Sequence, residues 1–160
     1  MQTARIFLQF LLIIVALGVL IHFLTGFIAP TSQEATISAY DMTIPRTPPE
    51  ARKLKNPVPK SPEIIAIGKS IYEGKGNCYV CHGKSGAGDG EGGGMLNPPP
   101  RDFTDPRFQH LRSDGELFWA TKYGVPATGM FSYIPRHLSE EEGWMVIRYI
   151  RTLRREVPAV

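Results

Sequence analysis

Two cysteines and a histidine lie close together near the middle of the chain, in the run Cys78-Tyr79-Val80-Cys81-His82. Two thiols separated by two residues, with an imidazole directly after the second, are what covalent attachment of a c-type haem requires. The thiols can add to the two vinyl groups of the porphyrin, and His82 then becomes the proximal ligand of the iron. The motif therefore predicts one covalently bound haem c and a chain that carries single electrons.

Three other kinds of site could use the same residues. A structural zinc site needs four ligands and, because the chain has only 2 cysteines, would have to recruit His110 and His137. A thioredoxin-like pair is typical of a βαβ surrounding, whereas the flanks here favour a helix before the motif and a glycine-rich loop after it. A disulfide across two residues would close a strained loop with little entropy to gain. Only the haem interpretation accounts for His82.

Glycine and proline are frequent among the 160 residues, with 16 and 14 copies, which favours irregular backbone over a dense helical bundle. Many of the prolines precede the haem motif, so we interpret residues 29–60 as a proline-rich basic linker and residues 61–160 as a small haem domain. From residue 61 onward, 12 Lys and Arg balance 12 Asp and Glu, which gives no sign of nucleic-acid binding. The basic side chains of the linker could contact anionic headgroups or a partner, or be merely solvated: Arg46, Arg52, Lys53, Lys55 and Lys60.

The run Ile6–Ile28 has 23 residues and no Lys, Arg, Asp or Glu, a length that spans a bilayer as a helix. A cleaved signal peptide has a shorter apolar region, and the best cleavage position, after Ala39, lies far beyond this run. Residues 1–28 are therefore expected to form a single uncleaved transmembrane anchor. Arg5 precedes the span and no Lys or Arg follows it as far as Pro45, so the amino end should face the cytoplasm and the haem domain the periplasm.

His22 is the one ionisable side chain inside the expected span. Gly18, His22 and Gly26 recur every four residues and so share one helix face, and small residues on such a face let another helix approach. We interpret this face as a contact with a partner helix in a larger complex rather than as a haem-ligand site. The alternative is a neutral imidazole near the outer interface with no role.

The first helix of the haem domain is predicted from its start signal. Ser61 and Pro62 begin an amphipathic helix that runs to about Glu73, and Gly76 follows it just before the haem motif. Gly68 lies in the middle of this helix, where glycine costs stability, so a close helix crossing is expected there.

Two later helices are predicted from capping boxes. Ser113 and Glu116 have this spacing and begin a helix that Gly124 closes. Ser139 and Glu142 begin the last helix in the same way. The buried stripe of this last helix is expected to comprise Val146, Ile147, Ile150 and Leu153, bordered by Trp144.

Gly88, Gly90 and Gly93, which follow the haem motif, match the G-x-G-x-x-G pattern of dinucleotide sites. No strand is expected before them and no clear helix after them, so the match is not supported by its context. We interpret this stretch as flexible backbone that passes close to the haem.

Taken together, these features resemble a class I cytochrome c, here tethered to a membrane. The resemblance covers residues 61–155 and implies an all-α fold in which three to four short helices and long loops surround one haem. It further implies that the first and last helices cross near Gly68 and an aromatic residue, either Trp144 or Tyr149. A proline carbonyl of the run 98–100 is expected to orient the His82 imidazole.

The resemblance places the distal iron ligand at Met130, in the loop after the middle helix. A thioether favours ferrous iron, so ligation by Met and His raises the reduction potential relative to two imidazoles. One departure is that Phe131 stands where many relatives have proline. The rival ligands are Met95, Met145, His110 and His137. The residues expected near the porphyrin or its propionates are Tyr79, Val80, Arg101, Trp119 and Tyr123.

Two axial ligands from the protein leave no open position on the iron, so an electron carrier is favoured over an enzyme. We expect a membrane-anchored monohaem cytochrome c that relays electrons in a respiratory or photosynthetic chain, docked to an integral membrane complex or a subunit of it, with other electron-transfer proteins as partners. The alternatives are a haem sensor or peroxidase-like enzyme with five-coordinate iron, and a structural subunit of a redox complex.

Overall fold

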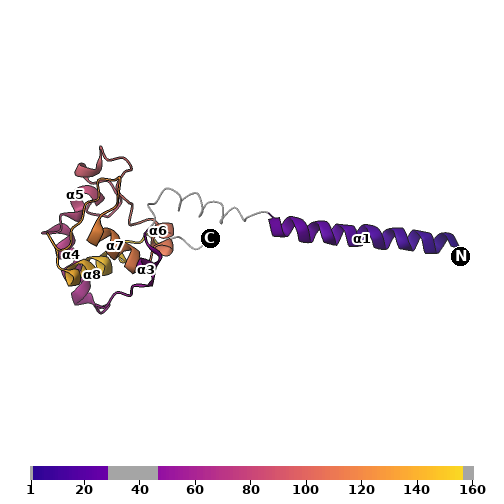
Figure 1. Cartoon of the computed structure of the whole chain (residues 1–160), viewed down its shortest axis with the longest axis horizontal. Coiled ribbons are helices and arrows are strands. Elements are labelled where there is room, and N and C mark those ends of the chain that lie inside the picture. The colour runs from indigo at the N-terminus through magenta and orange to yellow at the C-terminus, as the bar shows by residue number, and fades with distance from the viewer. Residues whose placement is uncertain (1, 29–46, 157–160) are drawn as a thin grey trace. The chain divides into compact units, whose positions relative to one another are not determined.

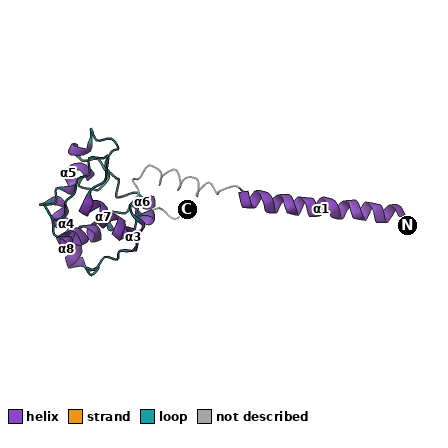
Figure 2. Cartoon of the chain, viewed as in Figure 1, coloured by secondary structure: helices purple, strands orange, loops and turns teal. Residues whose placement is uncertain are grey.

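The structure is a computed structural model that describes residues 2–28 and 47–156. The chain divides into two compact units, with the boundary between Ile44 and Pro45. The described residues form helices and loops with no strand among them, as Figure 2 shows. The expected all-α class is therefore confirmed, and the helices are labelled in Figure 1.

In the N-terminal unit, the described residues form helix α1 (Gln2–Ile28), on which the His22 side chain is exposed. Within the residues that the structure describes, no helix meets both the length and the hydropathy required of a membrane span. The anchor expected over residues 1–28 is thus not confirmed and stays a prediction, as does the partner-helix role of His22. Residues 29–46 of the expected linker lie outside the described residues.

Helix α4 (Pro62–Glu73) begins as predicted. The Ser61 hydroxyl accepts a hydrogen bond from the amide of Ile64 at 3.3 Å, and Pro62 occupies the first helical turn, where its missing N–H is not needed. The helix ends at Glu73 with Gly74 as its C-cap, slightly before Gly76.

Helix α4 packs on α8 (Glu140–Ile150), the last helix of the described residues. At the crossing, a Cβ atom on Gly68 would collide with the backbone carbonyl of Met145 and lie 3.1 Å from Cβ of Tyr149. The expected glycine crossing is therefore present, and its aromatic residue is Tyr149. Trp144 stacks instead on Phe118, with ring centroids 3.9 Å apart.

Both predicted capping boxes are formed. In α7 (Asp114–Tyr123) the Ser113 and Glu116 side chains cap reciprocally, and Gly124 closes the helix with φ of 75°. Ser139 and Glu142 do the same for α8. The predicted stripe of α8 is buried at Val146, Ile147 and Ile150, whereas Leu153 lies beyond the end of the helix and is half-buried.

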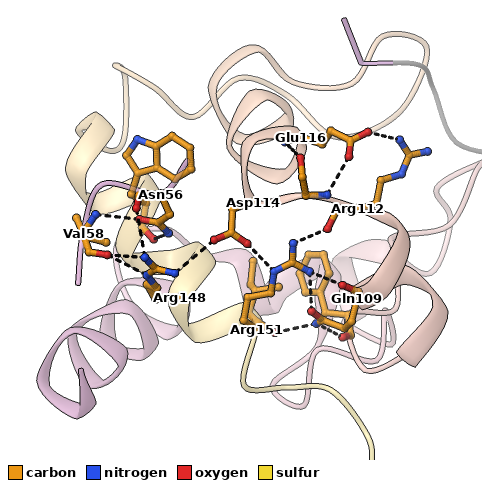
Figure 3. Close-up of polar contacts among 12 residues, drawn as sticks. Asn56, Val58, Gln109, Arg112, Asp114, Glu116, Arg148 and Arg151 are labelled. Atoms are coloured by element: carbon orange, nitrogen blue, oxygen red, sulfur yellow. Dashed lines mark hydrogen bonds and ion pairs between the residues drawn. The ribbon is translucent and has the colours of Figure 1, made fainter. Parts of the chain in front are cut away.

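Residues 47–60, here called the strap, lie in the C-terminal unit, which begins at Pro45. The linker bounds 29–60 stay a prediction. Helix α3 (Pro49–Lys53) buries Ala51, which is 1% exposed, against α7. The Arg148 guanidinium of α8 donates to the carbonyl of Val58 at 2.6 Å, and the Asn56 amide donates to the carbonyl of Trp144 at 3.0 Å (Figure 3). The strap is thus fixed to α8 through the Val58 carbonyl and to α7 through the buried Ala51 side chain.

Three short elements were not predicted. Besides α3, they are α5 (Cys78–His82), the 3₁₀ turn η1 (Glu91–Gly93) and α6 (Pro106–Leu111). The start of α6 has a local signal, because the Asp105 carboxylate accepts from the amide of Arg107 at 2.8 Å and Pro106 follows it directly.

Candidate functional site

The haem motif forms a helix of its own, α5, which holds Cys78, Cys81 and His82 within little more than one helical turn. Both cysteines are free thiols, so the disulfide alternative is not formed in this structure. Burial raises the pKa of the Cys78 thiol to about 12. The raised pKa favours the neutral thiol at Cys78, and both sulfur atoms lie on one short helix.

The His82 ring is held in a defined orientation. Its Nδ1 atom lies 3.0 Å from the backbone carbonyl oxygen of Arg101, so Nδ1 carries the hydrogen and donates it, and Nε2 keeps its lone pair for a metal ion. The ring stacks on Phe103, with centroids 4.2 Å apart. Burial lowers the pKa of His82, against the opposing effect of the Arg101 carbonyl, and this favours the neutral imidazole that a metal ligand requires.

The carbonyl that orients His82 was predicted in the wrong residue. It belongs to Arg101, which directly follows the proline run, and not to a residue of 98–100. The Pro100 carbonyl faces the glycine-rich loop instead, because a Cβ atom on Gly88 would lie 2.6 Å from its oxygen.

The glycine-rich loop folds back over α5 and satisfies its carbonyl groups. The amide of Gly88 donates to the carbonyl of His82 at 2.8 Å, and the amide of Gly90 donates to that of Cys81 at 3.1 Å. Gly83 and Gly88 adopt φ of 78° and 80°, which residues with a Cβ rarely reach. The loop therefore passes close to the haem motif, and its amides hold the backbone of the motif in place. Its distance from a bound haem stays a prediction.

Met130 lies in a tight loop after α7. The amide of Val125 donates to the Met130 carbonyl at 2.8 Å, and the amide of Met130 donates to the Thr128 hydroxyl at 3.1 Å. A Cβ atom on Gly129 would lie 2.6 Å from the Leu96 side chain, so the segment after the glycine-rich loop packs against this one. The Met130 side chain is half-buried.

The rival ligands differ in their surroundings. Met95 is 99% exposed, and Met145 lies in the middle of α8. His110 is exposed near the end of α6, and the exposed His137 ring meets the Phe131 ring edge-on at a centroid distance of 6.1 Å. Among the described residues, no three His, Cys, Asp or Glu side chains are grouped so as to hold a metal ion, so the zinc alternative finds no support there. The choice of Met130 stays a prediction.

Tyr133 is a site residue that the sequence reasoning missed. Burial raises the pKa of its hydroxyl to about 12, and Cys78 and Cys81 add to the shift. The Tyr133 hydroxyl is therefore near both cysteines. Its ring stacks on Phe131 with centroids 4.7 Å apart. The segment that follows Met130 therefore faces the haem motif. The only available sequence signal was an aromatic residue three positions after the expected ligand.

Arg101, Trp119 and Tyr123, the residues expected to bind propionates, make the following contacts within the protein. The Arg101 guanidinium lies over the Phe108 ring, 6.0 Å from its centroid. The Trp119 and Tyr123 rings, both from α7, lie 5.3 Å apart, and Tyr123 is 58% exposed. Their contact with a propionate stays a prediction.

The donor set fits a c-type haem. The two thiols are unpaired, the imidazole is neutral with Nε2 free, and the packing around the thiols is tight. A Cβ atom on Gly76 would lie 3.2 Å from Sγ of Cys78, and one on Gly92 would lie 3.6 Å from Sγ of Cys81. Cys78 and Cys81 would hold the group covalently and His82 would ligate the iron, which when bound supplies a reversible one-electron change.

A family model described as Cytochrome c matches residues 65–154. Among solved structures, the chain is similar to a protein of the Kuenenia stuttgartiensis reducing HAO-like protein complex Kustc0457/Kustc0458, with 29% sequence identity and a TM-score of 0.55. That match covers 64% of this chain and 50% of the other, so this chain spans half of that protein's length. The KustC0563 c-type cytochrome is 27% identical with a TM-score of 0.45, and the match covers 55% of this chain and 98% of that one. A search among curated proteins found no match.

Proposed function

The chain belongs to the cytochrome c family, and from this premise we propose that it is a membrane-anchored monohaem carrier of single electrons. The observation that carries the proposal is the state of His82. Its Nδ1 atom donates a hydrogen bond to the Arg101 carbonyl at 3.0 Å and burial lowers its pKa, which leaves a neutral imidazole with an oriented Nε2 on the same short helix as two free thiols. Cys78, Cys81 and His82 are the attachment site, and Met130 is the distal ligand.

Electron transfer is favoured over substrate chemistry by the number of protein ligands. If His82 and Met130 both held the iron, no ligand position would be left for a substrate. The chain would then act as a carrier within a redox assembly. The similarity to part of a protein from a reducing HAO-like protein complex supports partners that are themselves redox proteins.

The attachment of the haem is tested by the mass of the denatured full-length chain, purified from a host that matures c-type cytochromes. The expected result is a gain equal to one haem, because two thioether bonds survive denaturation. The double variant Cys78→Ser with Cys81→Ser should lose the gain completely, whereas Met130→Ala, which removes no attachment point, should keep it. A wild-type chain without the gain would refute the proposal.

The anchor is proposed from the sequence of Ile6–Ile28, which has no charged side chain over 23 residues. We expect the full chain to stay with membranes washed in alkaline carbonate and in high salt, because hydrophobic insertion resists both. A variant that lacks residues 6–28 but carries a cleavable export signal should be released by the same washes. External protease should reach the haem domain only from the periplasmic side. Release of the intact chain by carbonate would contradict the anchor.

A further inference from the structure

Tyr72 is a buried residue near the end of α4 that haem attachment does not use. Its side chain is 0% exposed, and its hydroxyl donates a hydrogen bond to the carbonyl of Gly83 at 2.8 Å. Gly83 directly follows His82 in the sequence. The hydroxyl therefore reaches out of the helical core to the peptide next to the proximal ligand.

The Tyr72 ring is itself fixed from the other side. It meets the Tyr149 ring edge-on, with centroids 5.2 Å apart and planes at 65°. Tyr149 belongs to α8 and lies at the crossing with Gly68. The packing of α4 on α8 therefore helps to fix the place of the Tyr72 hydroxyl.

His82 and the peptide after it are held by hydrogen bonds from several segments of the chain. The Arg101 carbonyl holds Nδ1 of the ring, the Gly88 amide holds the His82 carbonyl at 2.8 Å, and Tyr72 holds the carbonyl of the next residue. The first two come from loops. The Gly83 carbonyl also accepts a hydrogen bond from the loop amide of Gly86 at 3.1 Å. Among these bonds, the one from Tyr72 comes from a helix of the core, and a buried hydroxyl strongly resists the loss of its acceptor.

We infer that Tyr72 is a positioning residue for the proximal ligand, acting through its hydrogen bond to Gly83. The bond fixes the peptide after His82 relative to the α4–α8 core and so limits movement of the backbone that carries the imidazole. The inference rests on the proposed function, because His82 must be the iron ligand. A ligand held in one orientation in both oxidation states suits a carrier, since little has to rearrange when the electron moves.

The test compares Tyr72→Phe with Tyr149→Phe in the full-length haem-loaded protein. Each change removes one hydroxyl and keeps the ring packing, but no hydrogen bond from the Tyr149 hydroxyl is found among the described residues. We expect Tyr72→Phe to speed amide hydrogen exchange of Gly83 and Gly88 about ten-fold, equivalent to about 1.4 kcal/mol. It should also move the paramagnetically shifted NMR signals of the His82 ring in the ferric protein. Tyr149→Phe should change neither.

The outcomes separate the inference from the function on which it rests. A wild-type chain without covalent haem overturns the proposed function before any variant is compared. Equal exchange rates and equal His82 signals in the two variants would overturn the role of Tyr72 alone. If Tyr72→Phe does not accumulate as a haem protein, a fluorotyrosine placed at position 72 keeps the size of the ring and strengthens the donor. The His82 signals must then shift, and unchanged signals would refute the inference.

Discussion

Replacing Met130 with alanine is expected to lower the reduction potential of the protein by on the order of 0.2 V, a fraction of the roughly 0.8 V range that axial ligands set in haem proteins. The physical reason is that a thioether stabilises ferrous iron, whereas water or an imidazole in its place favours the ferric state. The weak ferric absorption band at the red end of the spectrum, which reports a sulfur ligand, should disappear. Potentiometric titration followed by absorption spectroscopy measures both quantities.

The loop around Met130 makes this change a local one. The loop is closed by backbone groups and the Thr128 hydroxyl, which bonds the Met130 amide at 3.1 Å and the Val125 carbonyl at 2.8 Å, so truncating the Met130 side chain leaves these bonds intact. Met95→Ala is the matched control because that side chain is 99% exposed. If Met95→Ala removes the band and Met130→Ala does not, the assignment of the distal ligand is wrong.

The same variants separate the alternative functions. A five-coordinate sensor or peroxidase-like enzyme would lack the sulfur band already in the wild-type chain. A purely structural subunit would support the same turnover of its complex with and without the Met130 side chain. Electron transfer requires turnover to slow in Met130→Ala, because the driving force for accepting an electron falls with the potential.

The parts of the fold that could be predicted are those decided by neighbouring residues. Helix starts depend on side chains within three positions of each other, and Ser61, Ser113 and Ser139 each form the expected cap. The haem motif is equally local, because its two thiols and imidazole lie within five residues. Gly68 was identified because glycine in a helix interior has a cost that a close crossing explains.

The parts that could not be predicted depend on contacts between distant residues. His82 bonds to the carbonyl of Arg101 and not to that of the neighbouring Pro100. A shift of one residue in this irregular segment would exchange the two, and the sequence has no periodic pattern there that predicts the position. The strap was taken for a linker because its composition is that of one. It is nevertheless fixed, since Arg148 and Trp144, about 90 positions later, supply partners for Val58 and Asn56. No local pattern encodes these pairs.

The Glu116 carboxylate joins the strap to α7. Its replacement is the second change for which we expect a large effect, here on the stability of the fold. The side chain is 5% exposed and accepts hydrogen bonds from Arg112 at 2.9 Å, from the Ser113 amide at 2.8 Å and from Thr47 at 3.1 Å. The Arg52 guanidinium of the strap lies 3.3 Å away (Figure 3). One carboxylate thus caps α7, neutralises the buried Arg112 and holds both ends of α3.

Glu116→Gln should lower the free energy of unfolding at pH 7 by about 3 kcal/mol, the lower end of the range for removing one partner of a buried ion pair. Arg112, itself 7% exposed, would lose its ion pair with Glu116, while the volume of the side chain at position 116 hardly changes. Chemical denaturation followed by circular dichroism measures the loss. Glu141→Gln, an exposed acid in the first turn of α8, is the control and should cost about 0.5 kcal/mol. Equal losses in the two variants would contradict the role of Glu116.

The loss of stability in Glu116→Gln should also depend on pH, which a change in packing alone would not produce. Burial acts to raise the pKa of Glu116, but the Ser113 amide and the Arg112 and Arg52 guanidinium groups outweigh it, so the pKa lies below its ordinary value of 4.5. A carboxyl with a lowered pKa in the folded chain stabilises it above the unfolded value, and this contribution is lost as the pH falls through the folded value. The stability difference between the wild type and Glu116→Gln should therefore be full near pH 7 and shrink below about pH 4.5. A difference that stays constant down to pH 3 would show that the carboxylate charge is not what holds the strap to α7.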